Sequence, residues 1–161
     1  MFTVRAAFNE QAEWRAAAEA ARAFFAELRN FAELMPGVER VTAEAGGAAA
    51  RWLIRADVPV VGSIRQAFAV AQAVDLPGLI EWLPAAGERK NFLRYEVSFE
   101  ERGAMTRVGV RLAVEVRREN ARELHPLAGL AGERRLSAEL EKGITHMMRT
   151  YLQKARARLE R

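Results

Sequence analysis

The chain contains two histidines, which are the first candidates for acid–base or metal chemistry. His125 precedes Pro126 in a predicted loop, and His146 stands beside Met147 in a predicted C-terminal helix. A pair 21 positions apart, without an acidic pair at ligand spacing, does not match a zinc site. His146 is expected at the flank of the helix. It is a candidate acid or base for a pocket, but a solvated side chain is the favoured interpretation.

Nucleophilic and phosphate-binding motifs are also missing. Ser63, Ser98 and Ser137 lie in ordinary strand or helix contexts, and no Ser/His/Asp order stands out. The glycine pair in "AGGA" (45–48) indicates a hairpin turn rather than a phosphate loop. The chain has no cysteine, which excludes disulfides and thiolate metal sites. The sequence therefore predicts no catalytic residue, no metal site and no cofactor.

A charged side chain inside a cavity would be the best sign of catalysis, because burying an unpaired charge is costly. Arg94 and Glu96 alternate with Tyr95 and are expected on the outer face of their strand. The facing of Arg55 and Asp57 is open, because a Val-Pro loop follows directly. An enzymatic role is therefore open, and a non-catalytic role is favoured.

The composition describes an ordinary globular chain of 161 residues, 50% of them hydrophobic, which fits one domain spanning 1–161. The net charge is +4, and all but three of the 25 basic residues are arginine. Arginine can grip phosphate, but the acidic residues are interleaved with the basic ones, so a nucleic-acid partner is not expected. No window is apolar enough to span a bilayer, and we expect a soluble, cytoplasmic protein.

The N-terminal segments change period twice. Residues 2–8 alternate as a half-buried strand, and apolar residues from Trp14 to Leu28 fall at helical spacing, which predicts a helix over about 10–29. Asn30 and Glu33 form a capping signature for a short second helix, and Pro36-Gly37 ends it.

Turn signals then recur at intervals of roughly ten residues, which predicts consecutive antiparallel hairpins from Val38 onward. In the last predicted strand, the valines and leucine from Val108 to Val116 share one face and arginines the other. A helix from Glu133 to about Glu160 follows, with one apolar stripe. Gly143 inside it suggests close packing against a strand or a bend.

Three stretches carry a resemblance to a known superfamily: "FFAELRNFAELMPGVERV" (24–41), "RADVPVVGSIRQAFAV" (55–70), and "VDLPGLIEW" (74–82) with "FLRYEVSFEERGAMTRVGVRLAVEV" (92–116). With these motifs, the chain resembles the START/Bet v 1-like (SRPBCC) superfamily of polyketide cyclase/dehydrase and lipid transport type. Within it, the chain is most similar to the G-subunit-like family of carbon monoxide dehydrogenase. The resemblance implies an α+β helix-grip fold: a seven-stranded curved antiparallel sheet wrapped around a long C-terminal helix, with a helix pair after strand 1.

The resemblance also implies a cavity between the sheet and the C-terminal helix. Aromatic, methionine and leucine side chains on the inner stripes are the candidate ligand-binding residues, and core packing is the alternative for each. They are Phe25, Phe31, Leu34, Trp52, Phe68, Trp82, Tyr95, Met147 and Tyr151. The two tyrosines are the most specific candidates, because a buried hydroxyl needs a partner and could orient a ligand.

Three functions are compatible with this pattern. The favoured one is binding of a hydrophobic small molecule or lipid, in a carrier or sequestration role. The second is an accessory role toward a partner enzyme, as the resemblance to the carbon monoxide dehydrogenase family implies. The third is an enzyme of polyketide cyclase or dehydratase type. The ligand, the oligomeric state and the pathway are left open by the sequence.

Overall fold

Alternating side chains along seven segments produce one antiparallel sheet in the computed structural model, which describes residues 1–161. Its strand order is β1-β7-β6-β5-β4-β3-β2, so β1 and β2 are the edges. The strands are β1 (Phe2–Trp14), β2 (Val38–Ala43), β3 (Ala49–Val58), β4 (Gly62–Leu76), β5 (Leu79–Pro84), β6 (Asn91–Arg102) and β7 (Met105–Arg118). The predicted seven-stranded antiparallel sheet is therefore confirmed.

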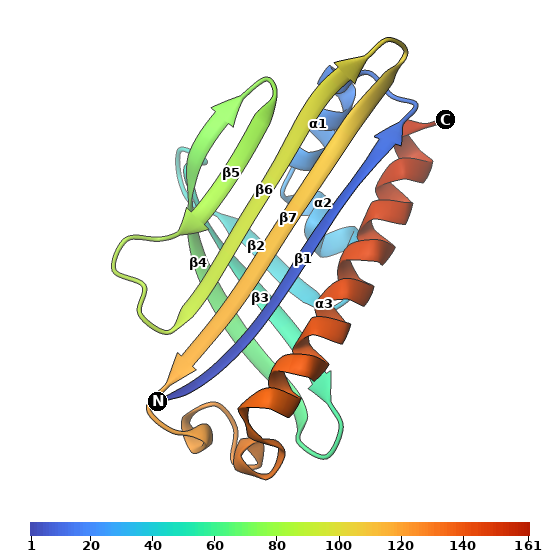
Figure 1. The fold of residues 1–161 in the computed structure, drawn as a ribbon. Coiled ribbons are helices and arrows are strands. Elements are labelled where there is room, and N and C mark those ends of the chain that lie inside the picture. The colour runs from blue at the N-terminus through green and yellow to red at the C-terminus, as the bar shows by residue number, and fades with distance from the viewer.

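The helices lie on the concave side and along one edge of this sheet. They are α1 (Ala18–Ala26), α2 (Arg29–Leu34), the 3-10 turn η1 (Ala121–Glu123) and α3 (Ala128–Leu159). Figure 1 shows the sheet curling so that β2–β4 cross behind β6, β7 and β1, while α3 runs the length of β1. This arrangement is the predicted helix grip. No helix is both long and apolar enough to cross a membrane.

The first strand is longer than the sequence pattern indicated. Residues 9–14, assigned above to a helix, instead continue β1 and pair in unbroken register with β7, from Asn9 opposite Arg111 to Trp14 opposite Thr106. The helix prediction over 10–29 was wrong in its first half. Trp14 fits both a helix and a strand, because it begins the helical spacing and also continues the alternation in which Phe8 faces inward. Pairing with β7 favours the strand.

The helix pair also differs at its junction. Asn30 does not cap α2; its side-chain Nδ2 donates to the carbonyl of Phe24 at 2.9 Å, so it caps the end of α1. The predicted capping signature was therefore wrong, since the N-cap of α2 is Leu28, without a side-chain bond. The predicted stop is confirmed: α2 ends at Leu34, and Gly37 adopts a φ of +86°.

The long C-terminal helix is confirmed, but its break lies elsewhere than predicted. Gly132 has φ 81° and ψ 165°, which separates the first turn of α3 from the continuous helix that follows. At Gly143 the helix is regular, and an added Cβ would meet nothing within 4 Å. The expectation of close packing or a bend at Gly143 was wrong.

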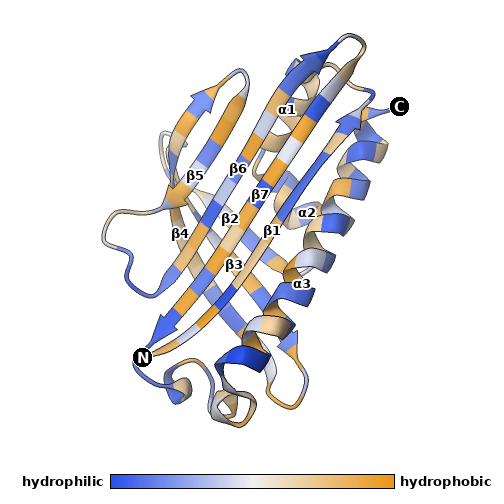
Figure 2. Ribbon diagram, viewed as in Figure 1, coloured by the Kyte–Doolittle hydropathy of each residue, from blue (hydrophilic) through white to orange (hydrophobic).

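Side chains facing the concave side form two apolar clusters, and Figure 2 shows the alternation of apolar and polar residues along the strands. The main core has 31 buried residues and includes the aromatic side chains of α1, α2, β3 and β6. A smaller cluster of five closes the end of the molecule that holds the β3–β4 turn and the start of α3. Its members are Val4, Val58, Val61, Ala128 and Leu136.

Side chains of α3 protect the exposed edge of β1. The N–H of Thr3 donates to Glu133 Oε1 at 2.9 Å, and the N–H of Arg5 donates to Ser137 Oγ at 3.0 Å. At the other end, one residue beyond each element, the N–H of Arg15 donates to Glu160 Oε2 at 2.7 Å. These bonds satisfy edge groups that could otherwise pair with another chain, and they fix α3 against the sheet.

Candidate functional site

An apolar cavity of about 50 Å³ lies between the sheet and the N-terminal half of α3. Twelve of its 13 lining residues are hydrophobic. They come from β1, β3, β4, β7, α3 and the loop that follows η1: Val4, Ile54, Ala56, Val58, Ile64, Phe68, Val114, Val116, Leu124, Leu136, Leu140 and Ile144. The lining draws on both apolar clusters, so the cavity marks the place where the main core and the smaller cluster fail to close on each other.

The remaining lining residue, Gln66 on β4, connects the cavity to a polar cluster at the start of β6 and the end of β7. Its Oε1 accepts hydrogen bonds from Arg118 Nη2 at 2.6 Å and from Asn91 Nδ2 at 3.0 Å. Asn91 Nδ2 also donates to the carbonyl of Ala67 at 2.8 Å. Asn91 and Arg118 are each only 9% exposed, so this polar cluster of Gln66, Asn91 and Arg118 lies largely inside the fold.

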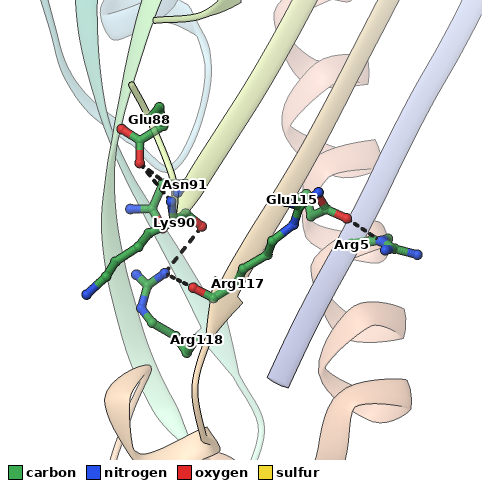
Figure 3. Close-up of polar contacts among 7 residues, drawn as sticks. All are labelled: Arg5, Glu88, Lys90, Asn91, Glu115, Arg117 and Arg118. Atoms are coloured by element: carbon green, nitrogen blue, oxygen red, sulfur yellow. Dashed lines mark hydrogen bonds and ion pairs between the residues drawn. The ribbon is translucent and has the colours of Figure 1, made fainter. Parts of the chain in front are cut away.

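Arg118 is held without a direct ion pair. Its Nη1 donates to the carbonyls of Arg117 at 2.7 Å and Lys90 at 3.3 Å, as Figure 3 shows. No carboxylate oxygen lies within 4.0 Å of a guanidinium nitrogen of Arg118, so it forms no ion pair. Desolvation lowers the pKa of Arg118, while the more distant charges of Glu123 and Glu88 raise it, and the net direction is downward.

The loop before β6 is organised by one carboxylate. Glu88 Oε1 accepts hydrogen bonds from the backbone N–H groups of Arg89, Lys90 and Asn91 at 3.1, 3.0 and 3.0 Å. Burial raises the pKa of Glu88, but these three bonds and the charge of Arg118 outweigh it, so the pKa lies below 4.5. Glu88 therefore places Asn91 at the polar cluster (Figure 3).

The nine predicted ligand-binding residues are all buried, and eight of them belong to the main core rather than to the cavity lining. Phe68 is the one that lines the cavity. Phe31 lies at the centre of the others, with ring centroids 4.7 Å from Trp52, 4.8 Å from Tyr151 and 5.1 Å from Tyr95. Ligand contact by all nine residues stays a prediction.

The two buried tyrosines both pack against Phe31, and their hydroxyls have no hydrogen-bond partner. Burial raises the pKa of both phenols above the ordinary value of 10.0, and for Tyr95 the neighbouring Tyr151 adds to the effect. Both phenols are therefore neutral at physiological pH and could donate a hydrogen bond.

Solved structures that resemble this fold include aromatase/cyclases and a START superfamily protein. The di-domain ARO/CYC StfQ from the steffimycin biosynthetic pathway has a TM-score of 0.65 at 15% identity, over 98% of this chain and 51% of that one. The Streptomyces aromatase/cyclase Zhui has a TM-score of 0.63 at 16% identity, covering 94% and 93% of the two chains. A START superfamily protein from Mycobacterium smegmatis has a TM-score of 0.59 at 17% identity, covering 96% and 97%.

This chain has the START/Bet v 1-like helix-grip fold. It spans about half the length of the di-domain proteins. At these identities, the similarity concerns the fold alone, and the narrower resemblance to the carbon monoxide dehydrogenase family stays a prediction. No family model matches the sequence, and no curated protein matches it.

Within this helix-grip fold, the charged candidates from the sequence lie away from the cavity. His146 is exposed, and His125 Nδ1 accepts a hydrogen bond from the backbone N–H of Leu127 at 3.0 Å. Arg55 and Asp57 form an exposed ion pair at 3.7 Å. Arg94 is exposed on the outer face, as predicted.

The polar cluster of Gln66, Asn91 and Arg118 was not identified from the sequence. Arg118 has the same inward parity as Val114 and Val116, so the alternation used for β7 would have placed it inside. Gln66 likewise lies between the inward residues Ile64 and Phe68. The signal was therefore present in the sequence: each is a polar residue at a position where the strand alternation expects an apolar, inward-facing one.

Proposed function

We propose that the chain binds an apolar small molecule or a lipid between the concave sheet and α3, in a carrier or sequestration role. The observation that carries this proposal is the cavity at the junction of the two apolar clusters, lined by twelve hydrophobic residues and one amide. A concave, mostly apolar site with few polar groups is the usual form of a small-molecule pocket.

The size of the cavity limits which ligands fit without a change in the structure. About 50 Å³ accommodates a small apolar group, whereas drug-sized ligands occupy pockets of roughly 300–1,000 Å³. A larger ligand requires residues 119–132 to move outward together with Leu124, which lines the cavity. The break at Gly132 provides the hinge, because the first turn of α3 is already separate from the continuous helix. Contact with the aromatic residues around Phe31 would require further opening along α3.

The alternative is an enzyme of polyketide cyclase or dehydratase type, and the aromatase/cyclases among the similar structures support the cyclase part of it. Such a reaction needs positioned acid and base groups at the ligand. The cavity lining offers one amide and no carboxylate or imidazole, so binding is the function proposed first. The accessory role toward a partner enzyme stays a prediction, since nothing in the cavity or the polar cluster favours it.

Methyl NMR with octan-1-ol tests binding directly. The expected result is saturable shifts of the methyl groups of Ile64, Val116 and Ile144, which line the cavity. Extraction of the purified protein followed by mass spectrometry identifies any natural ligand. Unchanged methyl spectra up to the solubility limit, together with an extract that contains no protein-dependent compound, would refute the proposal.

Two variants in which an alanine is replaced by phenylalanine test where the ligand binds. Ala56 lines the cavity, and Ala56→Phe is expected to fill it and lower the affinity for octan-1-ol at least tenfold. Ala69→Phe is the matched control, because Ala69 lies on β4 between the inward-facing Phe68 and Val70 and so faces the opposite side. Equal losses in the two variants would place the ligand elsewhere.

A further inference from the structure

Arg118 is a buried cation whose direct partners are all neutral. It reaches the carbonyl oxygens of Lys90 and Arg117 and the side-chain oxygen of Gln66. A buried charge without a counter-ion is costly, and arginine is the side chain best shaped to bind a planar anion. The position of this cation beside the one polar residue of the cavity points to a ligand with an acidic head group.

The hydrogen bonds fix the orientation of both amides in the polar cluster. Asn91 must turn its NH₂ toward Ala67, because a carbonyl oxygen only accepts. Gln66 must turn its oxygen toward Arg118, because a guanidinium only donates. Asn91 Oδ1 is consequently buried without a donor, and Gln66 Nε2 has no acceptor among the side-chain hydrogen bonds of the chain.

Arg118 has donors to spare, and the nearby acids are engaged with the backbone. Its guanidinium carries five N–H donors and makes three hydrogen bonds within the chain. Glu88 accepts from three backbone N–H groups, and Glu123 accepts from the N–H of Glu119 at 3.1 Å. These two carboxylates moderate the charge of Arg118 at a distance but do not occupy its donors.

We propose that the ligand is an amphipathic monocarboxylic acid, with its carboxyl group on Arg118 and Gln66 and its apolar tail in the cavity lined by Phe68, Val116 and Leu140. This proposal rests on the proposed function and names the class of ligand for the same site. The spare donors of Arg118 and Gln66 Nε2 bind the carboxylate oxygens. A ligand that also carries a hydroxyl beside the carboxyl group would satisfy Asn91 Oδ1.

The composition of the polar cluster favours a carboxylate over a phosphate. One arginine is the only cation, and the fields of Glu88 and Glu123 disfavour a doubly charged head group. A single planar carboxylate matches both the charge and the geometry of the guanidinium.

The first test compares octanoate, labelled with ¹³C at the carboxyl carbon, with octan-1-ol at pH about 7.5, where octanoate is ionised. Octanoate is expected to bind at least tenfold tighter, and its bound carboxyl group should show a pKa below that of free octanoate. If both probes bind equally and the pKa is unchanged, the carboxylate proposal is wrong while the apolar site stands. If neither probe binds, the carboxylate proposal fails, and the proposed function fails with it when the extract of the purified protein also contains no protein-dependent compound.

Three variants at arginine positions test whether the preference for octanoate depends on Arg118. Arg118→Gln is expected to lower octanoate affinity more than octan-1-ol affinity, so that the octanoate preference falls to about twofold or less, and Arg118→Lys is expected to restore part of it. Arg117→Gln is the matched control, because Arg117 is the exposed neighbour that lies over the Phe92 ring at 4.5 Å. An octanoate preference that persists in Arg118→Gln would overturn the assignment. If this variant does not fold, the pKa measured on the unaltered protein decides.

Discussion

The guanidinium of Arg118 donates to Gln66 Oε1 at 2.6 Å, which joins the end of β7 to the first third of β4 across the concave face. The short β5 pairs with β4 only over residues 70–76 and with β6 only over residues 95–98. Beyond these ranges, side chains replace the missing strand: Asn91 Nδ2 donates to the carbonyl of Ala67 at 2.8 Å. The same cluster therefore closes a gap in the sheet and borders the cavity.

Asn91→Ala should lower the free energy of unfolding by about 2 kcal/mol, because it removes two hydrogen bonds and leaves the carbonyl of Ala67 without its donor. Urea unfolding at neutral pH measures the change. Asn9→Ala is the control, since Asn9 is an exposed residue of β1 and should change stability by less than about 0.5 kcal/mol. Equal effects at the two positions would show that the cluster does not stabilise the sheet.

Gly37→Ala should destabilise the protein by about 2–4 kcal/mol, for two reasons. The φ of +86° is unfavourable for alanine, and a Cβ would lie 2.8 Å from the carbonyl oxygen of Arg55. Gly46→Ala separates the two effects, because Gly46 has φ +92° but no atom within 4 Å, and it should cost about 1 kcal/mol. Thermal and urea unfolding of both variants provide the comparison. Similar losses would mean that the backbone around Arg55 yields to the new methyl group.

Tyr151→Phe should raise the free energy of unfolding by about 1 kcal/mol, because the buried hydroxyl has no hydrogen-bond partner in the folded chain. The ring itself is retained, and with it the stacking on Phe31 at 4.8 Å. Urea unfolding measures the change, and Tyr95→Phe should behave alike. A loss of stability would show that the hydroxyl has a partner in solution. A loss of octan-1-ol affinity would instead support the predicted contact between Tyr151 and the ligand.

The strand pattern was sufficient for the sheet because its signals are local. The facing of β7 from Val108 to Val116 and the stop at Pro36-Gly37 each follow from a few neighbouring residues, and both are confirmed. The length of β1 was not readable in this way. Residues 9–14 obtain their strand conformation from the ladder with β7, a partner about a hundred residues away, which overrides the helical spacing that begins at Trp14.

The site was less predictable than the fold for a similar reason. The aromatic residues around Phe31 attracted attention because of their type, but they pack on one another in the main core. The cavity exists where two clusters meet, and that gap depends on how α3, which runs along β1, packs against β3. The strand alternation alone would have placed Gln66 and Arg118 on the inward face, but their pairing with each other depends on how β4 and β7 lie in the folded sheet.

Acid should weaken the fold partly through Glu115, an outer residue of β7. Burial raises its pKa, but hydrogen bonds and charge from Arg5 and from Arg117, at 2.6 Å, outweigh this, and the pKa lies below 4.5. Figure 3 shows its pairing with Arg5. Because the folded pKa is depressed, the stabilisation is present above about pH 4.5 and is lost as pH falls through the lower folded value.

The measurement is urea unfolding of the unaltered protein and of Glu115→Gln between about pH 2.5 and 7. The difference in free energy between them should be largest near neutral pH, shrink below about pH 4.5 and become smaller in high salt, since both arginines are well exposed. Glu101→Gln, at an exposed position of β6, should show no such pH-dependent difference. A Glu115→Gln difference that stays constant across this range would mean that the carboxylate charge contributes nothing and that the substitution acts through packing alone.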